Sequence, residues 1–250
     1  MMFVDSHAHL DEIEGLDEAI DEAKTVGVVA IIAVGCDPES NEAVKELARR
    51  YLGYVYPAFG LHPWDFREDG VSYLEANIDG CIALGEVGLD YRIDLDKKVQ
   101  IKAFRKVLEL ASRHGKPVII HARDAWMDAF KLVHELGVEK AVFHWFSGPL
   151  ELLDRIVEAG YYVSATPAVA YQRKHRMAIA RAPLSRILLE TDSPVAYRGV
   201  PARPRDVIET ANGVAALKGI DMEEVAARCV DNAEKFFNLK FSSSPTDIVR

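Results

Sequence analysis

Six side chains that could bind a metal ion are spread over most of the chain, and each lies at or just after the end of a short apolar run. They are His7, His9, Glu86, His121, His144 and Asp192. Imidazole and carboxylate groups together suit Zn, Mn, Fe or Mg rather than a metal bound by thiolates. Residues at the carboxyl ends of strands in a closed parallel barrel meet at one face. If the chain forms such a barrel, we expect these side chains to converge.

The number of candidate ligands indicates more than one ion. His7 and His9 are two residues apart, so in an extended strand both point the same way and can hold one cation, with Asp5 beneath them. A catalytic tetrahedral metal commonly takes three protein ligands and leaves one position for water. Two ions that share a carboxylate fit this set better, and Glu86 is the natural shared ligand because it comes from a strand between the two groups.

The elements that must position these residues follow a repeating pattern. Short apolar runs rich in Val and Ile alternate with amphipathic stretches, which predicts β-α units and a parallel sheet. Eight runs can be counted, at about Phe3 to Ser6, Val28 to Val34, Tyr54 to Phe59, Cys81 to Leu84, Val118 to Ile120, Ala141 to Phe143, Tyr161 to Ser164 and Ile187 to Leu189. We therefore predict an α/β fold, a (β/α)8 TIM barrel. An open doubly wound sheet is the alternative, but no glycine-rich phosphate fingerprint follows the first run.

Helix signals between the runs agree with this pattern. From Leu95 to His114 apolar residues recur every three or four positions, and Gly115 then stops the helix. Asp37 before Pro38 is a typical helix start. A stretch from Asp221 to Phe237 has no strand after it, so we expect an additional C-terminal helix that closes the outside of the fold.

Length and composition favour one large domain. The chain has 250 residues, of which 49% are hydrophobic and 28% charged, as is usual for a globular protein. We expect a single hydrolase barrel over residues 1–240 and a flexible C-terminal tail over 241–250, which contains a Ser-Ser-Ser-Pro run. No signal peptide or membrane span is recognisable, which predicts a cytoplasmic protein. The cysteines Cys36, Cys81 and Cys229 suggest reduced thiols rather than disulfides or a thiolate site.

The charge balance argues against broad attraction to nucleic acid, because the net charge is −9 and the pI is near 5.4. Two basic groups stand out against it. They are Arg173, Lys174, His175 and Arg176, and then Arg198, Arg203 and Arg205. In the predicted barrel both groups fall in loops on the face that carries the ligands, where they could hold phosphates. The alternative is an ordinary solvated surface.

Several motifs, taken in order, match one known family. They are Asp5-Ser6-His7-Ala8-His9-Leu10, Gly60-Leu61-His62-Pro63, Gly85-Glu86-Val87-Gly88-Leu89-Asp90-Tyr91, His121-Ala122-Arg123, His144-Trp145-Phe146-Ser147-Gly148 and Leu189-Glu190-Thr191-Asp192-Ser193-Pro194. Over roughly Met2 to Leu239 the chain resembles the TatD-like metal-dependent deoxyribonucleases of the amidohydrolase superfamily. The resemblance departs from the usual pattern at Trp145, where a small residue such as Cys is common. It departs again in the loop from Val195 to Pro204, which lacks an expected Arg-Asn-Glu-Pro run.

The resemblance implies two divalent ions per chain, of Mg, Mn or Zn. His7, His9 and Asp192 would serve one ion and His121 and His144 the other, with Glu86 shared between them. It also implies hydrolysis of DNA phosphodiester bonds, stepwise from a 3′ end, with single-stranded DNA or 3′ ends as the partner. No membrane and no obligate protein partner are inferred. The two departures concern substrate range rather than the metal ligands.

The residue types suggest how such a site would work. Two ions about 3.5 to 4 Å apart would lower the pKa of a shared water and neutralise charge that develops on a phosphate. Asp192 would orient that water and accept its proton, or else serve only as a structural ligand. His62 could bind a phosphate oxygen or protonate a leaving alkoxide, with turn packing as the alternative. The catalytic residues expected are therefore Asp192, Glu86 and His62.

Other residues on the same face could contact substrate. Arg123, two residues after His121, could clamp a phosphate or pair with Asp5 or Glu190. Glu190, two residues before Asp192, is expected deeper in the barrel as a partner of the histidines. The aromatic residues Trp64, Tyr91, Trp145 and Phe146 could stack on an unpaired base, or could simply pack. We expect substrate contacts from His62, Arg123, Tyr91 and Trp145.

Two other functions remain open at this point. A barrel of the same superfamily could hydrolyse a carboxylic ester, an amide or the ester of an aminoacyl-tRNA, since similar metal ions activate water against carbon or phosphorus. A non-catalytic barrel stabilised by metal is less compatible with the sequence, because none of the six candidate ligands is missing.

Overall fold

The computed structural model describes residues 1–65 and 69–241. Its main sheet has eight parallel strands, each paired with the next along the chain. The strands are β1 (Phe3–Ala8), β2 (Val28–Val34), β3 (Val55–Leu61), β4 (Ala83–Asp90), β5 (Val118–Arg123), β6 (Ala141–Phe143), β7 (Tyr162–Ala165) and β8 (Ile187–Leu189). Ala8 bridges to Ser193, just beyond β8, and brings the first and last strands together. The predicted (β/α)8 TIM barrel is confirmed, and the sequential strand order excludes the doubly wound alternative.

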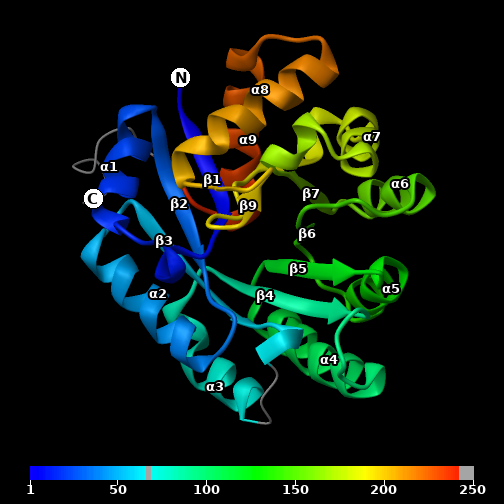
Figure 1. The fold of residues 1–250 in the computed structure, drawn as a ribbon. Helices are drawn as coiled ribbons and strands as arrows, with labels where there is room; N and C mark the ends of the chain where they lie inside the picture. Colours follow the sequence, from blue (N-terminus) through cyan, green and yellow to red (C-terminus); the bar gives the residue numbers. More distant parts are fainter. Residues whose placement is uncertain (66–68, 242–250) are drawn as a thin grey trace.

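Helices surround the barrel between successive strands, as Figure 1 shows. They are α1 (Leu16–Thr25), α2 (Pro38–Arg50), α3 (Gly70–Asn77), α4 (Lys97–His114), α5 (Trp126–Glu135), α6 (Leu150–Glu158), α7 (Arg173–Arg181), α8 (Val207–Lys218) and α9 (Met222–Phe237). A small antiparallel hairpin of β9 (Ala196–Tyr197) and β10 (Val200–Pro201) follows β8. Short 3-10 turns join several of these elements.

Local signals set the helix ends. The side chain of Asp37 accepts a hydrogen bond from the Ser40 amide at 2.7 Å, so α2 begins where the sequence predicts. The helix expected from Leu95 begins two residues later, at Lys97, because Asp96 caps it through the Lys98 amide at 2.7 Å. It ends at Gly115, whose φ of 62° lies in the left-handed region that favours glycine.

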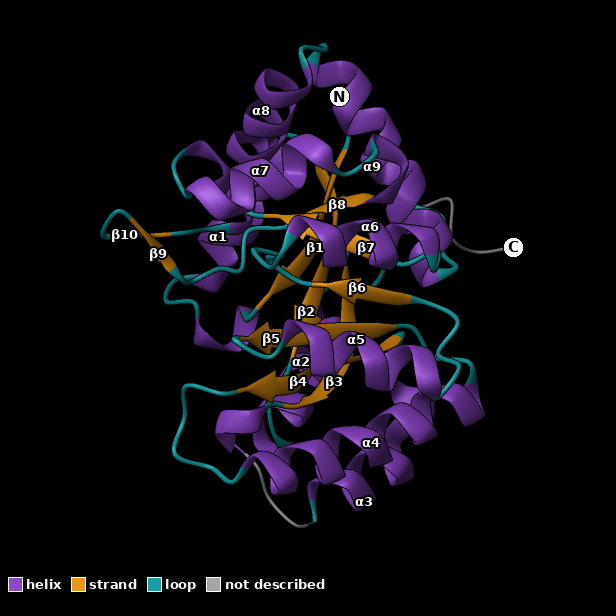
Figure 2. Cartoon of the chain, turned by 90° about the vertical axis from the view of Figure 1, so that its right-hand side faces the viewer, coloured by secondary structure: helices purple, strands orange, loops and turns teal. Residues whose placement is uncertain are grey.

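The additional C-terminal helix, expected on the outside of the fold, lies at one end of the barrel. Its end faces the amino-terminal opening of the barrel, where the Phe236 ring lies 5.4 Å from the ring of Tyr162 at the start of β7. The Asn232 amide donates to the carbonyl of Ile187, the first residue of β8, at 2.8 Å. Figure 2 shows α9 on the side where the strands begin. The helix therefore closes the barrel opposite the face that carries the candidate ligands.

Phe241, the first residue of the expected tail, contacts the rest of the fold. Phe241 is 7% exposed, its ring lies 5.5 Å from that of Tyr56, and its amide donates to Glu234 at 3.0 Å. The rest of the expected tail, 242–250, lies outside the described residues. None of the helices in the described ranges has the length and hydrophobicity needed to cross a membrane.

Candidate metal centre

The six candidate ligands meet at the carboxyl ends of the strands. His7 lies in β1, Glu86 in β4 and His121 in β5. His9 and His144 directly follow β1 and β6, and Asp192 lies three residues after the end of β8. Within this set, His7 lies in one group with Glu86 and His144 and in another with His9 and Asp192, and the donor atoms of each group lie within 4.8 Å of one another. His121 forms such a group with Glu86 and His62. All of these side chains are buried or nearly so. The convergence expected from the sequence is observed.

The two oxygens of the Glu86 carboxylate approach different histidines, although the rings of His7 and His144 stack 4.3 Å apart between their centres. Its Oε2 lies 3.4 Å from Nε2 of His7 and 3.5 Å from Nε2 of His9. Its Oε1 lies 2.6 Å from Nδ1 of His121 and 3.4 Å from Nε2 of His144. One carboxylate with an oxygen toward each group has the geometry of a ligand shared by two ions.

Asp192 completes the first group. Its Oδ1 lies 3.4 Å from Nε2 of His7 and 3.5 Å from Nε2 of His9. The Asp192 backbone has a φ of 53°, a left-handed conformation that costs a non-glycine residue about 1–3 kcal/mol. The neighbouring Thr191 is held by the Asp5 carboxylate, which accepts from the Thr191 amide at 2.9 Å and from its hydroxyl at 2.6 Å. Asp5 therefore helps to hold the strained segment in place.

Hydrogen bonds behind the histidines orient their rings. Nδ1 of His9 lies 3.1 Å from the carbonyl oxygen of Val34, which can only accept, so this nitrogen carries the proton and Nε2 is free to bind a cation. Nδ1 of His144 lies 3.0 Å from the Glu190 carboxylate, the position expected for Glu190 from its spacing to Asp192. In both rings Nε2 points toward the Glu86 carboxylate.

Asp90 is a site residue that we did not single out in the sequence. Its carboxylate lies 3.2 Å from Nε2 of His121 and accepts from Trp64 Nε1 at 2.7 Å and from the Arg92 amide at 2.9 Å. It therefore leaves Nδ1 of His121 facing Glu86. The signal was present, because Asp90 ends the same strand as Glu86 and is part of the Gly-Glu-Val-Gly-Leu-Asp motif.

Close backbone packing holds Glu86 in place. A Cβ atom on Gly60 would lie 2.1 Å from the carbonyl oxygen of Gly35 and 2.4 Å from the Glu86 amide, so only glycine fits. The buried Asn41 side chain makes two 2.8 Å hydrogen bonds with the Gly60 backbone. The Glu86 amide in turn donates to Gly35 at 3.0 Å. Strands β2, β3 and β4 thus approach closely behind the shared carboxylate.

The charges at the site suit a cation. Burial alone would raise the pKa of Glu86, but the charges of the neighbouring histidines, His144 first among them, and the hydrogen bond with His121 outweigh burial and hold the pKa well below its usual range. Burial is likewise outweighed at His144, where the charges of Glu190 and Glu86 raise the pKa to about 10. A divalent ion would take the place of the proton on such an imidazole, because a histidine must be deprotonated to bind a metal. The ionised carboxylates and the imidazoles together form a donor set that fits divalent ions.

His62 lies beside the ligands but has a different hydrogen-bond pattern. Its Nδ1 accepts from the Trp64 amide at 3.2 Å, so in the neutral ring Nε2 carries the proton, 3.7 Å from Oε1 of Glu86. Burial lowers the pKa of His62 to about 3, which keeps the ring neutral. The ring can therefore donate a hydrogen bond from Nε2 rather than bind a cation there.

Arg123 pairs with a different carboxylate from those expected. Its Nε lies 3.4 Å from Asp90, not beside Asp5 or Glu190, at an angle that makes no hydrogen bond among the described residues. The side chain is 42% exposed, and its guanidinium lies 5.5 Å from the centre of the Trp64 ring. The remaining guanidinium protons can therefore face a substrate.

The four aromatic residues of this face have different roles. Phe146 is fully buried against Trp126, so it packs in the core and cannot stack on a base. The Tyr91 hydroxyl donates to Asp128 at 2.7 Å, and Lys97 lies 4.0 Å from the centre of its ring. Trp64 is 58% exposed and beside the site. The Trp145 amide donates to Glu190 at 3.1 Å, which places its ring next to the metal centre.

The two basic groups are only partly available for phosphate binding. The first lies in α7 rather than in a loop, and within it His175 is buried and Arg176 donates to backbone carbonyls. In the second group Arg203 and Arg205 form ion pairs with Glu22 of α1. Arg173, Lys174 and Arg198 are exposed.

Cys36 also lies near the ligands, which the sequence did not suggest. It follows β2 at the carboxyl edge, and its Sγ lies 3.7 Å from Nδ1 of His9. Cys81 and Cys229 are buried, as expected, and the three cysteines form no disulfide.

The barrel and the donor set at its carboxyl edge define a class of protein, the metal-dependent hydrolases built on the (β/α)8 fold. Comparison with known proteins then identifies the family. A family model described as TatD related DNase matches residues 4–238. The chain therefore belongs to the TatD family, and the expectation of an enzyme of this family is confirmed.

Individual relatives cover nearly the whole chain. The human deoxyribonuclease TATDN3 is 32% identical over 94% of this chain and 94% of its own length. The uncharacterized metal-dependent hydrolase YabD of Bacillus subtilis is 31% identical over 95% of this chain and 100% of its own. The crystal structure of YJJV, a TatD homolog from Escherichia coli, has a TM-score of 0.88 and 28% identity over 95% of this chain and 98% of its own.

Proposed function

We propose that this enzyme is a deoxyribonuclease that hydrolyses phosphodiester bonds of single-stranded DNA stepwise from a 3′ end, using two divalent ions of Mg, Mn or Zn. The family description and the name of the human relative support DNA as the substrate. The single observation that carries the two-ion assignment is the Glu86 carboxylate, with Oε2 toward His7 and His9 and Oε1 toward His121 and His144.

The residues would divide the work as follows. His7, His9 and Asp192 would hold one ion and His121 and His144 the other, with Glu86 shared. Bound there, the ions would supply activated water and neutralise charge on the phosphate. Asp192, in contact with the first group through Oδ1, would orient the attacking water and accept its proton through its other oxygen.

Neutral and cationic donors around the ligands would position the phosphate. The Nε2 proton of His62 would donate to a phosphate oxygen, and the partly exposed guanidinium of Arg123 would bind a second oxygen. Both groups lie on the side of Asp90, so they would hold the phosphate from one direction. Stacking from Tyr91 and Trp145 would add affinity for an unpaired base.

The test replaces the shared ligand. Purified protein is stripped with chelator, reloaded with Mg, Mn, Co or Zn, analysed for metal content, and assayed on single strands labelled at either end. We expect two ions per chain and release of label from the 3′ end. Glu86→Gln should lower turnover at least about 10³-fold, because the ions that would stabilise the developing charge lose their shared ligand. Circular dichroism should remain unchanged.

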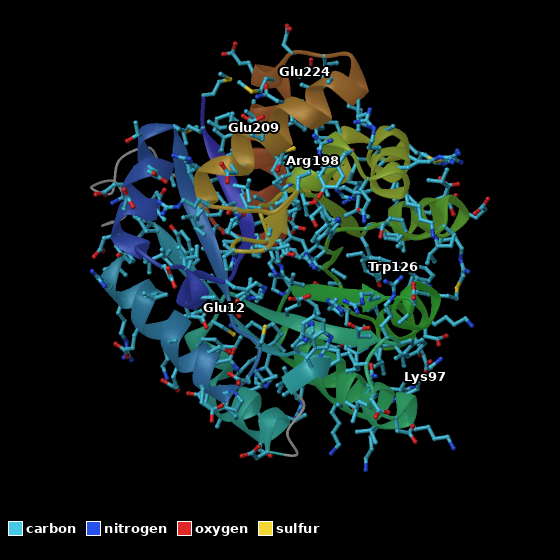
Figure 3. The ribbon with its side chains drawn as sticks, viewed as in Figure 1. Glu12, Lys97, Trp126, Arg198, Glu209 and Glu224 are labelled. Atoms are coloured by element: carbon cyan, nitrogen blue, oxygen red, sulfur yellow. The ribbon has the colours of Figure 1, made fainter. Side chains whose placement is uncertain are left out.

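A matched substitution controls for the loss of one carboxylate. Glu209→Gln removes an exposed carboxylate on α8 (Figure 3) that is not one of the candidate ligands, and should retain full activity. Equal activity with and without metal, or full activity of Glu86→Gln, would overturn the proposal. Activity on carboxylic esters with none on DNA would assign the enzyme to the other hydrolase class.

A further inference from the structure

The two departures from the family pattern noted in the sequence contact each other. The loop from Val195 to Pro204 folds into the β9–β10 hairpin, whose turn residues Arg198 and Gly199 have φ values of 53° and 85°. Two consecutive positive φ values are typical of the tight turns that match strand twist, so the hairpin is a defined structure. The ring of Tyr197 lies 5.4 Å from the ring of Trp145.

A second segment joins this contact from the link between β7 and α7. Nε1 of Trp145 donates to the Gln172 side chain at 2.9 Å. The guanidinium of Arg198 lies 4.7 Å from the centre of the Tyr171 ring, within the range of a cation–π interaction. These contacts thus link Trp145, Tyr171, Tyr197 and Arg198 into one cluster, which we call the aromatic wall.

The aromatic wall starts at the metal centre and extends away from it. Trp145 directly follows His144, and the Tyr197 hydroxyl donates at 2.8 Å to the carbonyl of Thr191, the residue before Asp192. Figure 2 shows the hairpin projecting on the side where the strands end, and Figure 3 shows Arg198, which lies in the turn of this hairpin, on the side toward α7. A polymer with one bond at the centre could continue along this surface.

The aromatic wall and its surroundings carry positive charges, whereas the molecule as a whole is negatively charged. Arg198, Arg173 and Lys174 are exposed, and in the described residues none of them forms an ion pair with a carboxylate, whereas Arg203, Arg205 and Arg181 all do. Cations that form no ion pair in the described residues, beside the exposed ring of Tyr171 and on a protein of net charge −9, favour a ligand that is both anionic and aromatic. Tyr171 is itself 40% exposed.

We propose that the aromatic wall is a subsite for the nucleotides of a single strand that lie beyond the bond being hydrolysed. Unpaired bases would stack on the rings of Trp145 and Tyr171, and a backbone phosphate would contact Arg198. A base pair hides these faces in its own stack, so the subsite selects single strands. The inference rests on the proposed function and specifies its substrate as a strand of several nucleotides.

The test compares a long and a short substrate in the metal-loaded enzyme. For an eight-nucleotide oligodeoxythymidine and for the dinucleotide, kcat/KM is measured and the ratio taken. Arg198→Ala should lower this ratio about fivefold or more, and so should Tyr171→Ala, because only the long strand reaches the wall. Tyr171→Phe should retain the ratio, since its ring face remains. An unchanged ratio, including the case in which both substrates are affected equally, would overturn the assignment of the aromatic wall as a subsite.

Control measurements keep the inference separate from the proposed function. Arg155→Ala removes an exposed arginine that also lies over a ring, 4.9 Å from Phe130 on the outside of the barrel, and should leave the ratio unchanged. If the metal-loaded wild-type enzyme cleaves no DNA, the proposed function is wrong. Binding of the labelled eight-nucleotide strand then tests separately whether the aromatic wall is a nucleotide subsite. Arg198→Ala should then raise Kd about fivefold and reduce its salt dependence. An unchanged Kd would show that the aromatic wall does not bind the strand.

Discussion

At the scale of single residues, hydrogen bonds separate groups that look alike in the sequence. His62 and His121 lie 4.3 Å apart between ring centres, and both approach Oε1 of Glu86. Asp90 holds Nε2 of His121, so Nδ1 faces Glu86, whereas the Trp64 amide occupies Nδ1 of His62 and leaves a proton on Nε2. Two neighbouring imidazoles therefore serve as a candidate ligand and a candidate donor.

This difference predicts the effect of removing His62. His62→Ala should lower kcat about 100-fold, because a hydrogen-bond donor to the phosphate is lost, while metal content stays at the wild-type value. Elemental analysis beside steady-state kinetics measures both quantities. His134→Ala, an exposed histidine on α5, is the control and should change neither. Loss of one ion from His62→Ala would show that His62 is a ligand.

At the scale of elements, the short apolar runs predicted the strands because each must be buried on both faces of a closed sheet. The donors at their ends converge because parallel strands finish at one edge. The basic run that begins at Arg173 contains no apolar run, and we expected it in a loop. It forms α7 because His175 and Ile179 pack inward. The orientation of His121 by Asp90, and the pairing of Arg203 with Glu22, depend on segments far apart in the chain. Local patterns carry no information about such contacts.

Helix α7 contains a buried histidine that links stability to pH. Nδ1 of His175 donates to the Phe146 carbonyl at 2.8 Å and Nε2 accepts from the Thr166 amide at 3.2 Å, so the folded ring is neutral. Burial lowers the pKa of His175 to about 4. Between that value and about 6.5 the unfolded chain binds a proton that the folded chain does not. The neutral His175 therefore makes its full contribution to the free energy of unfolding above about pH 6.5. This contribution is lost as the pH falls toward about 4.

Replacing His175 should weaken this dependence. His175→Gln retains a donor and an acceptor but does not titrate, so between pH 6.5 and 4 its free energy of unfolding should fall by about 2–3 kcal/mol less than that of the wild type. Urea unfolding at several pH values, with chelator present for both proteins, measures the two slopes. Identical slopes would contradict a neutral His175 in the fold.

At the scale of the whole molecule, the candidate ligands connect strands from all around the ring. The donors come from β1, β4 and β5 and from the ends of β6 and β8, and β1 meets β8 within this same group through the Asp192 amide and the His7 carbonyl, 2.9 Å apart. At the opposite opening α9 and Phe241 close the barrel. The two ends of the barrel are therefore closed by different means, one by packing and one by polar groups that a cation would join.

Metal loading should therefore stabilise the entire fold. At a free concentration 100 times Kd, each ion should add about 2.7 kcal/mol to the free energy of unfolding, which corresponds to a rise in Tm of several degrees. Thermal scans with and without chelator measure this rise, and Glu86→Gln should show a smaller one. A Tm that does not respond to metal in the wild type would exclude these residues as ligands.

The contact between His7 and Asp192 also bears on how the enzyme acquires its ions in the cell. These two candidate ligands of one ion are separated by nearly the whole barrel sequence, and they meet only where the first strand joins the last. During translation, the histidine pair emerges from the ribosome long before the carboxylate that completes its group. A nascent chain that has not yet reached Asp192 cannot assemble this donor set. Under the proposed two-ion assignment, uptake of this ion would therefore accompany closure of the ring.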